Sequence, residues 1–267
     1  MNTQRKKLVL LAGQSNMAGR GYATKEDLLP IDNVEMIRPD FKWQMAIEPV
    51  TKDRAFIGTF SEDGKKIESN DPFETVMPQE GQKVCGVGLG RTFAKYLSLA
   101  TDNSVVGLIP TAVGGTPIAS WQIGGVDTWD KDKKPYDDAI ILAKEAQKVG
   151  DIVAILWHQG ETDAMNQNQN YLEEFRTVIK NFRRDLNLSD DIPFIAGNLA
   201  SFYNSEIADY INLVDDALVT LKNEEPNFDF VDTKDLTHRG DNLHFDTPSL
   251  HILGKRYFDK YIEMTKK

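Results

Sequence analysis

A serine at position 15 stands where a catalytic nucleophile is expected. Ser15 belongs to the stretch GQSNMAG, which follows the apolar residues 8–12 without a break. Open α/β sheets place their sites at the carboxyl ends of strands, and a serine there attacks an ester once a neighbouring base takes its proton. The same residues also suit an ordinary turn, because Gly, Ser and Asn are common turn formers. The serine therefore indicates a nucleophile only if its partners occur elsewhere in the chain.

The segment GDNLHFD near the C-terminus supplies a candidate base and a candidate acid. His244 titrates near neutral pH, so its neutral imidazole can accept the proton of the serine. Asp241 lies three residues earlier, and in a turn this spacing brings a carboxylate to the other ring nitrogen, where it fixes the tautomer and stabilises the imidazolium. A lone histidine is more often structural or on the surface, and we interpret the other three in that way: His158, His238 and His251.

Two further segments follow predicted strands and supply hydrogen-bond donors. TAVGGTPIASW contains Gly114 and Gly115, and a glycine lets a backbone N–H approach a substrate without a Cβ in the way. WHQGETD contains Gln159, whose amide can donate from the next strand end. With the N–H of Ser15, these groups predict an oxyanion hole for an ester carbonyl oxygen. Taken singly, the glycine pair fits any strand exit, and QGETD fits a helix N-terminus capped by its Thr or Asp.

These segments can meet if the chain alternates strands and helices around a parallel sheet. Near-continuous apolar runs, typical of strands covered on both faces, occur at residues 7–13, 104–112, 152–160 and 193–200. Apolar residues three or four apart predict amphipathic helices at residues 89–97, 172–186, 207–221 and 248–262. Strands alternating with helices indicate βαβ units, whose strands all end at one rim of the sheet. The sequence therefore predicts an α/β fold that gathers the four segments at that rim.

Residues 23–81 depart from this rhythm. They are rich in Asp, Glu, Lys and Pro, and we interpret them as an elaborated connection with an edge strand near residues 34–37. Long connections on a rigid sheet often shape a binding site, although a solvated excursion without a role fits the same composition. Because no linker, repeat or low-complexity tract marks a boundary, residues 1–267 are expected to form a single domain.

Composition narrows the possible partners and locations. The formal net charge is -10, and such an acidic surface repels polyanions, which argues against nucleic acid. No apolar stretch is long enough for a bilayer, the basic start of the chain lacks an h-region and a cleavage site, and the single Cys85 excludes an internal disulfide. We therefore expect no membrane partner and a cytoplasmic location, with export by another route left open. The histidines and the cysteine show no metal-ligand spacing, so no metal or cofactor is expected.

The blocks GQSNMAG, GGTPIASW, WHQGETD and DNLHF, in this order, resemble the SGNH hydrolase superfamily. Within it they are similar to the sialate O-acetylesterase and acetylxylan esterase group, carbohydrate esterase family 6, and the resemblance extends over residues 13–245. It implies a three-layer α/β/α, flavodoxin-like SGNH hydrolase fold with a central five-stranded parallel sheet. It also implies that Ser15 lies in a loop after the first strand, and not in the tight nucleophile elbow of α/β-hydrolases.

Carried over to this chain, the family pattern assigns a role to each block. Ser15 matches the nucleophile, His244 the base and Asp241 the acid. Gln159 stands where the wider superfamily has an asparagine, a substitution that this group itself shows. The pattern assigns the oxyanion hole to Ser15 itself, Gly115 or its neighbour Gly114, and Gln159. It assigns support of the rim to Gln14 and Glu161.

The resemblance implies a serine esterase that removes acetyl groups from a small carbohydrate through an acetyl-enzyme. Acetylated xylooligosaccharides and O-acetyl sialic acid are the candidate substrates. Trp121, Trp129 and Trp43 are candidates for packing on a sugar ring, although each fits the core equally well. Arg20 suits either a substrate carboxylate or a pair with a local acidic residue. Two alternatives stay open, namely an SGNH esterase for another acyl ester and a non-catalytic carbohydrate-binding relative.

Overall fold

A seven-stranded sheet with the strand order β11-β10-β9-β1-β8-β3-β4 forms the centre of the protein. The structure is a computed structural model that describes residues 5–203 and 208–266. Six strands are parallel to their neighbours, and β4 runs antiparallel to β3. Because β1 lies in the middle, the segment that carries Ser15 leaves the centre of the carboxyl edge. The bounds are β1 Lys6–Gly13, β3 Val34–Ile37, β4 Trp43–Met45, β8 Val106–Pro110, β9 Gly150–His158, β10 Phe194–Gly197 and β11 Phe228–Val231.

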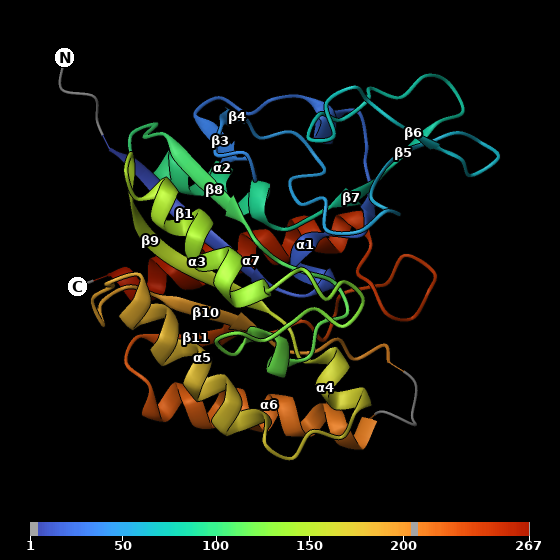
Figure 1. Ribbon diagram of the computed structural model, residues 1–267. Helices are drawn as coiled ribbons and strands as arrows, with labels where there is room; N and C mark the ends of the chain where they lie inside the picture. The colour runs from blue at the N-terminus through green and yellow to red at the C-terminus, as the bar shows by residue number, and fades with distance from the viewer. Residues whose placement is uncertain (1–4, 204–207, 267) are drawn as a thin grey trace.

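Helices cover both faces of this sheet (Figure 1). The α-helices are α1 Ser15–Ala18, α2 Gly90–Ala100, α3 Pro135–Ala146, α4 Glu161–Met165, α5 Tyr171–Asp185, α6 Ala208–Glu224 and α7 Thr247–Thr265, and the 3₁₀ helices are η1 Glu26–Leu28 and η2 Ile118–Trp121. Since strand side chains alternate between faces, Leu8 and Leu10 pack in one buried cluster with α3, α5 and α6, and Val9 and Leu11 in another with α2 and α7. The predicted three-layer α/β/α arrangement is thereby confirmed. No helix in the described part of the chain is long and apolar enough to cross a membrane.

The sheet is wider than the five strands expected. The predicted apolar runs correspond to β1, β8, β9 and β10, and the predicted helical stripes to α2, α5, α6 and α7, with Ile207 lying outside the described residues. The five adjacent strands β11, β10, β9, β1 and β8 make the expected sheet, and the long connection adds β3 and β4. The strand predicted near residues 34–37 is β3, but it is not an edge strand, because β4 pairs along its outer side.

The rest of the long connection contributes to a second, smaller sheet with the order β2-β7-β5-β6. Its strands are β2 Gly21–Tyr22, β5 Gly58–Phe60, β6 Lys66–Ile67 and β7 Lys83–Val87, all paired antiparallel. β2 follows closely on α1, so this sheet is attached to the chain segment that leaves the centre of the large sheet, at the upper right of Figure 1. The connection is therefore built into the fold and is not a solvated excursion.

Candidate active site

The end of β1 positions Ser15. Gly13 closes the strand with a φ of 125°, and a Cβ there would lie 2.3 Å from the carbonyl oxygen of His158, so this position requires glycine. The chain then turns into α1, whose first residue is Ser15. The Oγ of Ser15 lies 3.1 Å from Nε2 of His244. The structure thus brings together the two residues that the sequence pairs as nucleophile and base.

The other ring nitrogen of His244 faces Asp241. The distance from His244 Nδ1 to Asp241 Oδ2 is 2.7 Å, and Asp241 Oδ1 accepts hydrogen bonds from the N–H of Leu243 at 3.0 Å and of His244 at 2.8 Å. These bonds form the turn that the three-residue spacing allows. Burial lowers the pKa of His244, and the Asp241 carboxylate opposes this effect without cancelling it. The imidazole is therefore neutral at pH 7 and able to accept a proton.

Asp241 stays ionised beside this imidazole. Burial alone raises the pKa of a carboxyl group, but the N–H of His244 and the guanidinium of Arg239 hold the pKa of Asp241 well below its usual range. Arg239 Nε lies 2.7 Å from Oδ2, the oxygen that His244 also contacts. Arg239 is not among the site residues predicted from the sequence. Its signal, a basic residue two positions before the acid, is equally typical of a surface turn.

Asn16, directly after the serine, ties the loop of His244 to the end of β1. Its Nδ2 donates to the carbonyl oxygen of Leu243 at 3.2 Å, and its Oδ1 accepts from the N–H of Phe245 at 3.2 Å. Asn16 therefore holds the peptide groups on both sides of His244. Its Nδ2 also donates to Glu161 Oε1 at 2.6 Å, and burial raises the pKa of this carboxyl group. The sequence analysis passed over Asn16, although its place beside the serine was a usable signal.

Two backbone N–H groups at the rim remain available to an oxyanion. Within residues 5–203 and 208–266, neither the N–H of Ser15 nor that of Gly115 donates a hydrogen bond. The two loops run side by side, because the N–H of Val113 donates to the carbonyl oxygen of Gly13 at 2.9 Å. The N–H of Gly114 is already bonded to a carboxylate. Of the two adjacent glycines, Gly115 is the one with a free donor.

A buried ion pair holds the Gly114 loop in place. Asp53, from the long connection, accepts a hydrogen bond from the N–H of Gly114 at 2.7 Å, and its Oδ2 lies 2.7 Å from Nη2 of Arg20. The side chains of Arg20 and Asp53 are 1% and 2% exposed. Of the two interpretations of Arg20, the pair with an acidic residue is correct, although this residue lies 33 positions away in the chain. The guanidinium of Arg20 is thus not open to a substrate.

The amide of Gln159 is not free to serve an oxyanion. Its Nε2 donates to Asp163 Oδ2 at 2.5 Å and to the carbonyl oxygen of Thr116 at 3.1 Å, and these two bonds use both amide hydrogens. Gln14 Oε1 lies 3.4 Å from the same nitrogen and accepts from the N–H of Thr162 at 3.4 Å. The prediction of Gln159 as an oxyanion donor is therefore wrong. Gln159 and Gln14 instead hold neighbouring rim segments together.

Of the three tryptophans considered for sugar contact, Trp129 is open to solvent at the rim. This residue is 63% exposed, and a Cβ on Gly115 would lie 3.0 Å from its ring. Trp121 is fully buried in the core, so its prediction as a sugar contact is wrong. Trp43 is also excluded, because it packs over Gly107 near the amino end of β8, away from the carboxyl rim.

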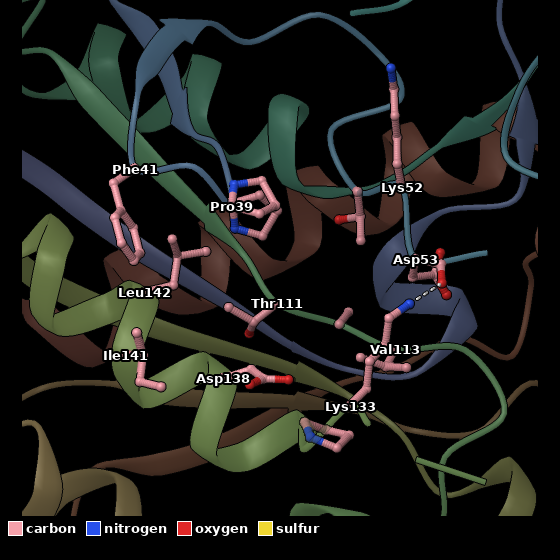
Figure 2. Close-up of a pocket in the computed structure, with 14 residues that line it drawn as sticks. Pro39, Phe41, Lys52, Asp53, Thr111, Val113, Lys133, Asp138, Ile141 and Leu142 are labelled. Carbon is pink, nitrogen blue, oxygen red and sulfur yellow. Dashed lines mark hydrogen bonds between the residues drawn. The ribbon is translucent and has the colours of Figure 1, made fainter. Parts of the chain in front are cut away.

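A cavity of about 330 Å³ flanks the rim on the side of α3 (Figure 2). Phe41, Ile141 and Leu142 line its apolar end. At the other end, Lys133 Nζ lies 3.5 Å from the backbone oxygen of Asp53, the contact drawn as a dashed line in Figure 2. None of the residues of the Ser–His–Asp cluster lines this cavity. The cavity is lined by Ala112 and Val113, just before Gly114, and does not contain the candidate site.

Known proteins are similar to this chain in sequence and architecture. A family model described as carbohydrate esterase, sialic acid-specific acetylesterase, matches residues 5–263. A probable carbohydrate esterase of Arabidopsis thaliana is 33% identical over 260 residues, which cover 96% of this chain and 90% of the relative. The X-ray structure of this Arabidopsis protein superimposes with a TM-score of 0.73 at 29% identity, covering 97% of this chain and 99% of the other. The crystal structure of NanS gives a TM-score of 0.70 at 15% identity, with 97% of each chain covered.

The buried ion pair leads to a prediction about stability. Asp53→Ala leaves the Arg20 guanidinium buried without its counter-charge and removes the acceptor of the Gly114 N–H. We expect the free energy of unfolding, measured by urea denaturation, to fall by about 3–5 kcal/mol. Asp151→Ala is the matched control, because Asp151 forms an ion pair with Arg5 whose side chains are 68% and 52% exposed. Its expected cost is about 1 kcal/mol or less. Equal losses in the two variants would contradict the structural role of Asp53.

Proposed function

The chain belongs to the sialic acid-specific acetylesterase family of carbohydrate esterases, and on this premise we propose that it is a serine esterase that removes acetyl groups from a carbohydrate through an acetyl-enzyme. Family membership makes the chain a carboxylic ester hydrolase. The observation that carries the proposal is the hydrogen-bonded series from Ser15 Oγ to His244 Nε2 at 3.1 Å and from His244 Nδ1 to Asp241 at 2.7 Å. A nucleophile, a base and an orienting carboxylate in this arrangement are what acyl transfer needs.

In the first half-reaction, Ser15 Oγ attacks the acetyl carbonyl carbon while His244 Nε2 takes the hydroxyl proton. The carbonyl oxygen becomes an oxyanion, to which the N–H groups of Ser15 and Gly115 donate. When this tetrahedral intermediate collapses, the bond between the carbonyl carbon and the sugar oxygen breaks. The imidazolium gives its proton to that oxygen, so the products are a sugar hydroxyl and acetyl-Ser15.

In the second half-reaction, His244 takes a proton from water as the water oxygen attacks the acetyl carbon. Collapse of the second intermediate breaks the bond to Ser15 Oγ, which recovers its proton from the imidazolium, and acetate leaves. Asp241 remains ionised throughout and stabilises the imidazolium in both halves. One water is consumed in each turnover, and the enzyme is regenerated.

An exposed aromatic ring beside the oxyanion donor supports a sugar as the leaving group. The ring of Trp129 lies against the Arg54 guanidinium, with 4.4 Å between the guanidinium carbon and the ring centroid, and this cation–π contact holds the ring in place. The indole nevertheless remains largely exposed next to Gly115. A fixed, exposed aromatic face suits packing against a pyranose ring. We propose O-acetyl sialic acid and acetylated xylooligosaccharides as the substrates to be compared first.

The direct test is acetate release by the parent enzyme and by Ser15→Ala. The substrates are p-nitrophenyl acetate, butyrate and octanoate, acetylated xylooligosaccharides and O-acetyl sialic acid. We expect the parent to prefer acetyl esters, and Ser15→Ala to lower kcat by about four to six orders of magnitude. Ser189→Ala, at an exposed serine outside the site, serves as the control. A preference for octanoate would assign the enzyme to another acyl ester, and sugar binding without hydrolysis by the parent would indicate a non-catalytic relative.

The pKa of His244 predicts the pH dependence of the reaction. The base must be neutral, so kcat/KM rises as the pH increases through the pKa of His244 in the free enzyme. Because burial lowers this pKa, the midpoint of the acid limb is expected below the ordinary histidine value of about 6.5. A pH profile of kcat/KM with p-nitrophenyl acetate measures it. A midpoint above neutral pH would show that His244 is not the base, or is not neutral in the free enzyme.

Asn16 is expected to act on kcat through geometry. Asn16→Ala removes the hydrogen bonds that hold the peptide groups on both sides of His244. A base displaced by a fraction of an ångström lowers kcat by roughly ten- to a hundredfold, with KM nearly unchanged, since Asn16 has no proposed contact with substrate. Steady-state kinetics measure both constants, with Asn223→Ala on the surface of α6 as the control. A kcat within about twofold of the parent would contradict this role.

A further inference from the structure

We propose that Arg239 is a positioning residue for the Asp241–His244 pair. Its guanidinium clamps the acid to the part of the protein that carries the nucleophile, and its charge acts on the imidazole. The inference rests on the proposed serine esterase activity. Nothing in the family resemblance assigns a role to this arginine.

Arg239 and His244 share one oxygen of Asp241. Oδ2 lies 2.7 Å from Arg239 Nε and 2.7 Å from His244 Nδ1, while Oδ1 accepts two backbone N–H groups. The carboxylate thus has four hydrogen-bond donors, of which one is a permanent cation. Since the Asp241 side chain is 33% exposed, it has room to rotate towards water. The arginine opposes this rotation by fixing the oxygen that orients the imidazole.

The far end of the arginine is anchored beside the nucleophile. Arg239 Nη1 donates to the carbonyl oxygen of Arg20 at 2.8 Å and lies 3.3 Å from the Sγ of Cys85. Its guanidinium also lies over the ring of Tyr22, 5.6 Å from the ring centroid. Arg20 and Tyr22 follow Ser15 in the chain within seven residues. One side chain therefore links the acid of the site to the segment that continues from the nucleophile.

The loop itself does not depend on Arg239 for its shape. His238 Nδ1 accepts hydrogen bonds from the N–H groups of Gly240 and Asn242, each at 3.1 Å, and Asn242 adopts a φ of 53° that closes the turn. Asn16 holds the loop from the other side. Variants at position 239 are consequently expected to fold. Any loss of activity then reports on the placement and charge of the Asp–His pair.

Three charged groups act on His244. Asp241 and Arg239 come from its own loop, and Arg20, which forms an ion pair with Asp53, lies in the segment after α1. The carboxylate raises the pKa of His244, whereas the two arginines lower it. Removing the charge of Arg239 while leaving the other groups in place must therefore raise the pKa of His244. The acid limb of the reaction would then move to higher pH. Loosening that exposes the imidazole moves the limb in the same direction, because burial lowers this pKa, so a variant that keeps the charge at position 239 is needed to separate the two effects.

The test compares kcat, KM and the pH profile of the parent with three variants, using p-nitrophenyl acetate. Arg239→Met is expected to lower kcat about tenfold or more with KM nearly unchanged, and to move the acid limb up by roughly half a pH unit to one unit. Arg239→Lys keeps the charge but not the planar fork, so the limb should stay at the parental pH with part of kcat recovered. Arg256→Met is the control. It removes an Arg–Asp ion pair of the same 2.7 Å length, whose arginine lies on α7, and should change neither kcat nor the midpoint of the acid limb.

Two results would overturn the proposal. The first is an Arg239→Met enzyme whose kcat and acid-limb midpoint equal those of the parent. The second is an Arg239→Met enzyme with a lower kcat but an unchanged midpoint, because that result reports structural damage alone. Thermal denaturation checks that each variant is folded, and Arg239→Gln, which keeps a donor without the charge, replaces Arg239→Met if that variant does not fold. Full activity in Ser15→Ala is a separate outcome, because it refutes the serine mechanism whatever Arg239 does.

Discussion

The candidate site depends on the hydrogen bonds that join the end of β1 to the loop before α7. Asn16 makes two of them, to the peptide groups on either side of His244, across 227 and 229 positions of sequence. Together with the core packing of Met17 and Phe245, they set the distance from the imidazole to Ser15. Glu161 holds the Asn16 amide from a third strand end. The parallel sheet makes this possible, since it brings all three segments to one rim.

The long connection stabilises the same rim through charge. Asp53 reaches from this connection to the Gly114 N–H and to Arg20, and water is excluded from both ions. A buried pair of this kind contributes little to stability compared with apolar packing, but removing one partner is costly, so it fixes the arrangement of the loops that it joins. The connection also completes the large sheet with β3 and β4 and supplies two strands of the small one. Residues 23–81 therefore hold the Gly114 loop in position.

The sequence predicts the layers because they follow from chain-local patterns. The pairing of Ser15 with His244 and Asp241 rests on residue types, the three-residue spacing and the family resemblance. Apolar runs and helical stripes define the strands and helices, and a parallel sheet then places the segments after β1, β8 and β9 together. The directions of side chains follow from packing between distant segments, and no local pattern encodes them. Gln159 turns to Asp163, Trp121 is taken into the core and Arg20 pairs with Asp53 for this reason. Asn16 and Arg239 have the composition of turn residues, and their contacts become visible only in three dimensions.

The central claim is a covalent acetyl-enzyme on Ser15, and its most direct measurement is the mass of the protein after rapid mixing with p-nitrophenyl acetate and acid quenching. The activated leaving group favours accumulation of the acetylated form. The account predicts the added mass of one acetyl group, located by peptide mapping on the peptide that contains Ser15, and absent from Ser15→Ala. Acetate release with no adduct on that peptide, at equal rates in parent and variant, would contradict it.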